Sequence, residues 1–122
     1  MSRPEISFIA FGSNMGNREH FIEQALLELS LHPEIIILKQ SSIFETEALE
    51  VTSQPDFLNG IVKIRTSLLP LDLLITLQGI ELKTGRIKRY DKGPREIDLD
   101  ILTYENYIMD SEYLKIPHHS LC

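Results

Sequence analysis

The sequence has a single cysteine, no tryptophan and no long hydrophobic run. With Cys122 alone, the chain can form neither an internal disulfide nor a cysteine-based zinc site, which fits a reducing compartment. Its longest apolar runs, such as residues 6–11 and 35–38, are far shorter than the roughly 20 residues that a membrane-spanning helix needs. The N-terminus also lacks a signal-peptide pattern. We therefore expect a soluble, cytoplasmic protein that has no membrane partner.

The chain also lacks an excess of positive charge. Its net charge of −6 at pH 7 argues against a general nucleic-acid-binding protein, which usually needs a basic surface. Half of its 12 lysine and arginine residues, however, fall within residues 83–95, where Asp91 is the one acidic residue. These six cations are Lys83, Arg86, Lys88, Arg89, Lys92 and Arg95. The segment predicts either a solvated basic loop or a binding site for an anion.

The length of 122 residues predicts one domain, residues 1–122, with a single hydrophobic core. Apolar periodicity and turn signals predict six main elements. They are a strand at 6–11, a helix capped by Asn17 that ends before Pro33, strands at 35–44 and 57–66, a helix at 70–82 and a strand at 97–104. Gly60 is a candidate bulge, and residues 105–106 are a candidate turn into a short strand at 107–109.

The order strand-helix-strand-strand-helix-strand is that of the ferredoxin-like, split βαβ arrangement. We therefore expect an α+β fold in which an antiparallel sheet carries both helices on one face. This fold hosts many activities, so the order of elements alone does not predict a function.

Two aspartates stand out in the last main strand. Strand side chains alternate between faces, so Asp98 and Asp100 share a face with their Cα atoms about 6.6 Å apart, while Ile97, Leu99 and Ile101 face the core. Two close carboxylates beside a cluster of cations fit Mg²⁺ with a bound phosphate. An exposed polar strand face is the alternative interpretation.

The residues alone do not decide the role of two other features, a turn and a pair of polar helix residues. The segment "GSNMG" at 12–16 is a strand-to-helix turn without the spacing or the lysine of a P-loop, and it predicts either backbone contacts to a ligand or a purely structural turn. Gln78 and Glu81 share a helix face near the basic segment, which by itself requires no function.

Taken together, these segments closely resemble the 6-hydroxymethyl-7,8-dihydropterin pyrophosphokinase family. The matching segments occur in the family's order and extend over almost the whole chain. They are "GSNMGNR" (12–18), "SQPDFLNG" (53–60), "LQGIELKTGR" (77–86), "GPREIDLDIL" (93–102) and "IPHH" (116–119).

The resemblance implies a ferredoxin-like enzyme of folate biosynthesis that transfers pyrophosphate from ATP to the hydroxymethyl oxygen of a reduced pterin and releases AMP. It implies two Mg²⁺ ions, both held by Asp98 and Asp100, with Arg86 and Arg95 as further catalytic residues. By the same resemblance, the ATP site comprises Gln78, Glu81, Arg86, Lys88, Arg95, Ile101 and His118. The pterin site comprises Thr46, Leu49, Phe57 and Asn59. No obligate protein partner is implied.

The chain departs from the family pattern in three places. Lys88 stands where many relatives have arginine, and the segment between Arg86 and Gly93 is shorter than in some relatives and lacks their tryptophan. The sequence also stops at Cys122, where relatives continue with an arginine, a second aromatic residue for the pterin and a further strand. We therefore expect a domain that is shortened at its C-terminus.

Two alternatives to this enzyme remain open. One is a truncated, nucleotide-binding relative with little or no catalytic activity. The other is a general two-metal phosphohydrolase that acts without a pterin, which the match at "PDFLN" disfavours.

Overall fold

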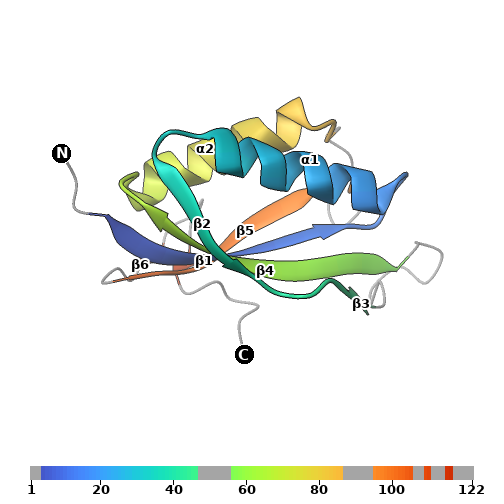
Figure 1. Cartoon of the computed structure of the whole chain (residues 1–122), viewed down its shortest axis with the longest axis horizontal. Helices are drawn as coiled ribbons and strands as arrows, with labels where there is room; N and C mark the ends of the chain where they lie inside the picture. Colours follow the sequence, from blue (N-terminus) through green and yellow to red (C-terminus); the bar gives the residue numbers. More distant parts are fainter. Residues whose placement is uncertain (1–3, 47–55, 87–94, 106–108, 111–114, 117–122) are drawn as a thin grey trace.

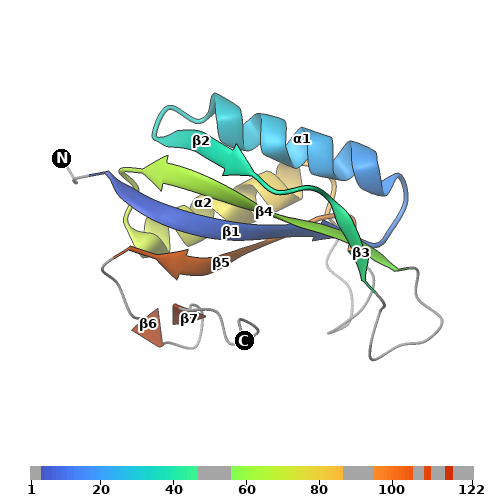
Figure 2. The same ribbon diagram turned by 60° about the horizontal axis from the view of Figure 1, so that its bottom comes forward.

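The computed structural model describes residues 4–46, 56–86, 95–105, 109–110 and 115–116. Two helices cover one face of a five-stranded sheet, and a two-stranded sheet lies next to β5 (Figures 1 and 2). The elements are β1 (Glu5–Ser13), α1 (Arg18–Leu31), β2 (Ile35–Gln40), β3 (Phe44–Thr46), β4 (Phe57–Thr66), α2 (Pro70–Lys83), β5 (Asp98–Tyr104), β6 (Met109–Asp110) and β7 (Lys115–Ile116).

The five-stranded sheet has the strand order that the ferredoxin-like arrangement requires. Its strands run β2-β4-β1-β5, with β3 also paired to β4, and every pair is antiparallel. Both helices lie on the same face, as Figure 1 shows. The predicted α+β fold class is therefore confirmed.

The first helix begins where the sequence predicted. Asn17 caps α1, and its side-chain oxygen accepts a hydrogen bond from the His20 N–H (3.1 Å). The second helix begins with Pro70, where a missing backbone N–H costs nothing, and ends before Gly85, whose φ of 113° favours glycine. Local signals therefore determine where both helices begin and end.

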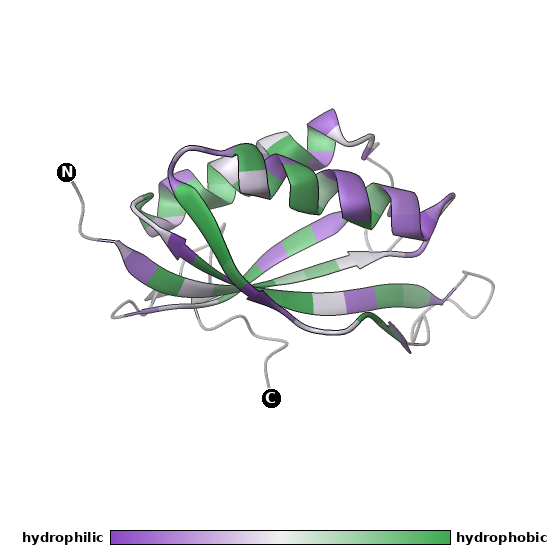
Figure 3. Ribbon diagram, viewed as in Figure 1, coloured by the Kyte–Doolittle hydropathy of each residue, from purple (hydrophilic) through white to green (hydrophobic). Residues whose placement is uncertain are grey.

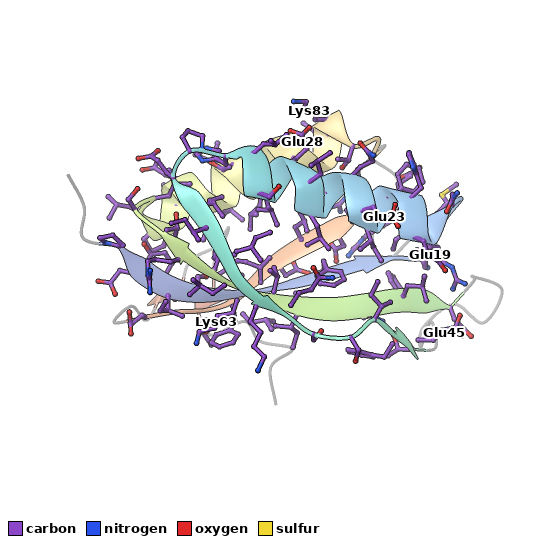
Figure 4. All side chains as sticks on the ribbon, in the orientation of Figure 1. Glu19, Glu23, Glu28, Glu45, Lys63 and Lys83 are labelled. Atoms are coloured by element: carbon purple, nitrogen blue, oxygen red, sulfur yellow. The ribbon has the colours of Figure 1, made fainter. Side chains whose placement is uncertain are left out.

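The core lies between the helices and the sheet. Strands β1, β4 and β5 contribute alternate residues to it, and Figure 3 shows apolar and polar residues alternating along the strands. The buried sheet residues include Ile9, Phe11, Val62, Ile64, Leu99 and Ile101, and the helices add Ile22, Ala25, Leu29, Leu73 and Leu77. The other sheet face, which we call the open face, has no helix over it among the described residues; Lys63 points away from the helices there (Figure 4).

The strand expected at 35–44 is two strands, which corrects the prediction. The β2 register shifts between Ile37 and Lys39, and the chain leaves regular pairing at residues 41–43. Ser41 takes the place of a strand partner there: its N–H donates to the Ile61 carbonyl, and its hydroxyl accepts from the Ile61 N–H, both at 2.8 Å. Residues 39–42 are all polar, and a strand signal resumes at residues 43–44, so the prediction joined two strands across a polar break.

Two further expectations are corrected. Gly60 is not a bulge, because β1 and β4 stay in register through it; a Cβ there would lie 2.2 Å from the Phe11 ring. The short strand after β5 is β6, and within the described part of the chain it pairs with β7 rather than folding back on β5. Residues 107–108 of that expected strand lie outside the described part.

Candidate functional site

Three strands place polar residues in one row across the open face. Gly12 on β1 lies opposite Asn59 on β4 and, on its other side, opposite Asp98 on β5. Two residues earlier on β1, on the same face of the sheet, Ala10 is the register partner of Asp100. Because Gly12 has no side chain, the Asn59 amide can lie close to the β1 backbone: a Cβ at Gly12 would lie 3.0 Å from Asn59 Oδ1.

Two arginines converge on Asp98 from different parts of the chain. Arg86, just after α2, places Nη1 3.3 Å from Asp98 Oδ1, and Arg95, just before β5, places Nη1 3.1 Å from Oδ2. Arg86 Nη1 also lies 2.8 Å from Glu81 Oε2. Glu81, Arg86 and Arg95 all belong to the sites implied by the family resemblance.

Glu81 joins α2 to β5. Its Oε2 accepts a hydrogen bond from the Leu99 N–H (2.8 Å), and the residue is only 6% exposed. Strand β5 lies at one edge of the five-stranded sheet, so this carboxylate accepts a hydrogen bond from a backbone N–H of an edge strand. Burial raises the pKa of Glu81 to about 7. The hydrogen bond from the Leu99 N–H and the charge of Arg86 lower this pKa, but burial has the larger effect.

The surroundings of Asp100 disfavour the charged form of its carboxyl group. Burial, the adjacent charge of Asp98 and a hydrogen bond to Asp98 raise the pKa of Asp100 to about 8. A cation shared by the two carboxylates would remove this repulsion.

Two aspartates are enough for Mg²⁺, which does not need a closed cage of protein ligands. In the described residues, no group of three or more histidine, cysteine, aspartate or glutamate side chains is placed to hold a metal. Mg²⁺ usually binds through one or two carboxylates and completes its coordination with water and phosphate oxygens. A pair of aspartates beside two arginines is therefore an arrangement that could hold Mg²⁺ together with a phosphate.

Three residues assigned by resemblance to the pterin lie together near the β3–β4 pairing. Thr46 is the register partner of Phe57, and its hydroxyl accepts a hydrogen bond from Asn59 Nδ2 (2.6 Å). The same Asn59 nitrogen lies 3.4 Å from the Phe57 carbonyl oxygen. These contacts orient the Asn59 amide beside an aromatic ring.

The remaining predicted residues differ in their placement. Gln78 is exposed on α2, whereas the Ile101 side chain is 2% exposed and packs in the core, so only the backbone of Ile101 is available to a ligand. Leu49, Lys88 and His118 lie outside the described residues.

The basic segment is not one uniform cluster. Lys83 pairs with Glu28 across the two helices (3.0 Å), on the side away from the sheet (Figure 4). Of the six cations, Arg86 and Arg95 are the described ones that reach Asp98. Lys83 therefore belongs to the helix packing and not to this site.

Sequence reasoning missed one residue at the site, Asn14. Its side chain is completely buried, and its Oδ1 accepts a hydrogen bond from the Arg95 N–H (2.7 Å). The Asn14 N–H donates in turn to the Arg95 carbonyl (3.0 Å). The turn signal at 12–16 marked this position but could not indicate a partner 81 residues away.

None of the helices in the described ranges is long and apolar enough to cross a membrane.

Comparison with known proteins shows which family the chain belongs to. The family model for 7,8-dihydro-6-hydroxymethylpterin-pyrophosphokinase matches residues 8–122. The chain is 44% identical over 120 residues to "Folic acid synthesis protein fol1" of Schizosaccharomyces pombe, covering 98% of this chain and 16% of that protein. It is 46% identical over 114 residues to the protein of the same name from Pneumocystis carinii, covering 93% of this chain and 15% of that one.

A shorter relative is covered more fully. The chain is 42% identical over 113 residues to "2-amino-4-hydroxy-6-hydroxymethyldihydropteridine pyrophosphokinase" of Bacillus subtilis, covering 93% of this chain and 68% of that protein. The chain thus spans about a sixth of the first two relatives and about two thirds of the third. On the family match and these identities, the chain belongs to the 7,8-dihydro-6-hydroxymethylpterin-pyrophosphokinase family.

Proposed function

We propose that this protein is a 2-amino-4-hydroxy-6-hydroxymethyldihydropteridine diphosphokinase that acts in the cytoplasm. It transfers the pyrophosphoryl group of ATP to the hydroxymethyl oxygen of 6-hydroxymethyl-7,8-dihydropterin, giving the pterin diphosphate and AMP, in folate biosynthesis. The observation that carries the proposal is the row Asn59–Gly12–Asp98. It puts an amide suited to a heterocycle and a carboxylate suited to a metal phosphate on one face of the sheet, separated by a single glycine.

Asp98 and Asp100 would hold Mg²⁺, of which two ions are expected. Bound Mg²⁺ supplies charge neutralisation and polarises phosphoryl oxygens. The aspartates themselves present two carboxyl groups on one face of a single strand. Phosphoryl transfer depends chiefly on positioning and on neutralising charge, so the site needs no covalent nucleophile.

Arg86 and Arg95 would bind the phosphate oxygens and stabilise the charge that develops on the departing AMP. Each guanidinium carries five N–H donors, and each pairs with Asp98 through Nη1, so its other donors can reach a phosphate. Gln78, Glu81, Lys88, the Ile101 backbone and His118 complete the proposed ATP site.

Asn59 and Phe57 would bind the pterin. The Asn59 amide carries both a donor and an acceptor, which matches the amide-like edge of a pterin. Thr46 accepts from Asn59 Nδ2, and this bond fixes how the amide is turned. The Phe57 ring offers a stacking surface, and Leu49 completes the proposed pterin site.

The deciding experiment measures AMP release with ATP and Mg²⁺, with and without 6-hydroxymethyl-7,8-dihydropterin. AMP formation that requires the pterin supports the proposal. Nucleotide binding without turnover would favour the non-catalytic relative, and AMP or phosphate release without pterin would favour a phosphohydrolase.

A variant tests the role of the aspartates in the same assay. Asp98→Asn removes the charge that pairs with both arginines and is proposed to bind the metal, and we expect AMP release to fall by about a hundredfold or more. The matched control is Asp72→Asn, in the first turn of α2 at the far end of that helix from Arg86, which should keep near-normal turnover. Near-normal turnover in Asp98→Asn would contradict the metal assignment.

A further inference from the structure

Asn14 is a completely buried polar residue that the proposed reaction does not use directly. It follows the end of β1, and two of its hydrogen bonds go to a single residue: Oδ1 accepts from the Arg95 N–H (2.7 Å) and the Asn14 N–H donates to the Arg95 carbonyl (3.0 Å). A buried amide is costly unless it is hydrogen-bonded, and here the bonds hold the backbone of Arg95 on both sides.

Arg95 needs such support because of its place in the chain. It lies before β5 begins, in a stretch with no regular secondary structure. Its guanidinium nevertheless has to meet a fixed partner, since Nη1 lies 3.1 Å from Asp98 Oδ2. A long, flexible side chain reaches such a target reliably only when its Cα is held in place.

We propose that Asn14 is a positioning residue for Arg95: it holds the Arg95 backbone so that the guanidinium stays on Asp98 and is ready for a phosphate. The link to catalysis rests on the proposed function, whereas the clamp on Arg95 does not. This assigns a role to the Gly12–Asn14 turn, for which the sequence left a structural and a ligand-binding interpretation open.

The test uses two substitutions of Asn14 and a control from the same turn. Asn14→Ala removes the acceptor, and Asn14→Leu removes it while keeping the same number and branching of side-chain heavy atoms, so that the loss of the acceptor is tested without opening a cavity. The control is Ser13→Ala, because Ser13 is also completely buried and its hydroxyl has no hydrogen-bond partner among the described residues. Folding of each variant is checked by its thermal unfolding transition.

The first readout needs no activity. The Arg95 side-chain Nε–Hε signal in ¹⁵N NMR spectra is assigned by its loss in Arg95→Lys. We expect Asn14→Ala and Asn14→Leu to shift this signal and lower its heteronuclear NOE, because the guanidinium is no longer held, whereas the Arg86 signal and the Ser13→Ala spectrum change little. An unchanged Arg95 signal in both Asn14 variants would overturn the clamp.

The second readout is a double-mutant cycle on kcat/KM. Asn14→Leu should lower kcat/KM about tenfold in the parent protein, the effect of about one lost hydrogen bond. In the Arg95→Ala background the same substitution should cost about twofold or less, because the residue through which it acts is gone. An equal loss in both backgrounds would show a general structural role and overturn the proposal. A parent protein without pterin-dependent turnover would refute the proposed function and leave the NMR result to decide on the clamp.

Discussion

At the scale of single residues, Gly12 lies between two residues of the proposed site, Asn59 and Asp98. A glycine in the middle of a strand weakens it, because glycine loses the most conformational freedom on folding. Here a Cβ would lie 3.0 Å from Asn59 Oδ1 and 3.3 Å from the Leu58 carbonyl oxygen. The missing side chain therefore leaves room for the Asn59 amide and for whatever lies between it and Asp98.

Gly12→Ala should displace the Asn59 amide and weaken pterin binding about tenfold, the effect of about one lost hydrogen bond. Binding of Mg²⁺-ATP should stay the same. Isothermal titration with each ligand measures both effects.

Gly79→Ala is the matched control, because a Cβ at Gly79 on α2 meets no atom within 4 Å. It should leave pterin affinity unchanged and raise the stability of the helix by up to about 1 kcal/mol. If Gly12→Ala binds the pterin as tightly as this control does, the absence of a side chain at Gly12 has no role in pterin recognition.

At the scale of elements, the contact between α2 and β5 depends on Glu81. Its carboxylate accepts from the Leu99 N–H on the edge strand and pairs with Arg86, so one side chain anchors both the strand and an arginine of the site. The alternation of residues predicted β5 correctly, and it also predicted which of its residues face the core. This alternation did not predict that the carboxylate of Glu81 accepts a hydrogen bond from the backbone of β5.

Glu81→Ala should destabilise the protein by about 1–3 kcal/mol, because the buried Leu99 N–H is left without its acceptor. Glu81→Gln keeps an acceptor oxygen and should cost less. Chemical denaturation measures the free energy of unfolding, and hydrogen exchange at the Leu99 amide shows whether the edge bond is lost.

The control is Glu28→Ala, which removes a surface ion pair with Lys83, a side chain that is 68% exposed. A pair of this kind contributes about 0–1 kcal/mol. A Glu81→Ala variant that is no less stable than Glu28→Ala would contradict the role of Glu81 at the edge of β5.

At the scale of the whole molecule, two buried carboxylates link stability to pH. The pKa of Asp100 is raised from 3.8 to about 8, and that of Glu81 from 4.5 to about 7. The folded protein therefore binds more protons than the unfolded chain between about pH 4 and pH 8, so stability falls as the pH rises through this range. The charges that cause this instability are those that a bound cation would neutralise.

The ligand-free protein should accordingly lose more than about 1 kcal/mol of unfolding free energy between pH 5 and pH 8, since one pKa unit corresponds to about 1.4 kcal/mol. Denaturant unfolding at several pH values measures the slope. Asp100→Asn should flatten it, whereas Asp72→Asn, whose parent residue is on the surface of α2, should not. A parent protein that grows more stable from pH 5 to pH 8 would contradict the raised pKa values.

The sequence by itself determined the features that depend on local periodicity. Apolar spacing and caps were enough for both helices, and strand alternation was enough to put Asp98 and Asp100 on one face. Local patterns work here because the 3.6-residue and two-residue repeats are properties of the chain's own backbone.

Tertiary structure decided the pairing of residues that are far apart in the chain. It placed Asn59 and Asp98 on either side of Gly12, bound Asn14 to Arg95 and joined Glu81 to Leu99. It also ended β2 early, through the bonds of Ser41 to Ile61. These contacts depend on strand register and on how α2 packs, and both result from burying the whole core at once, which no local pattern encodes.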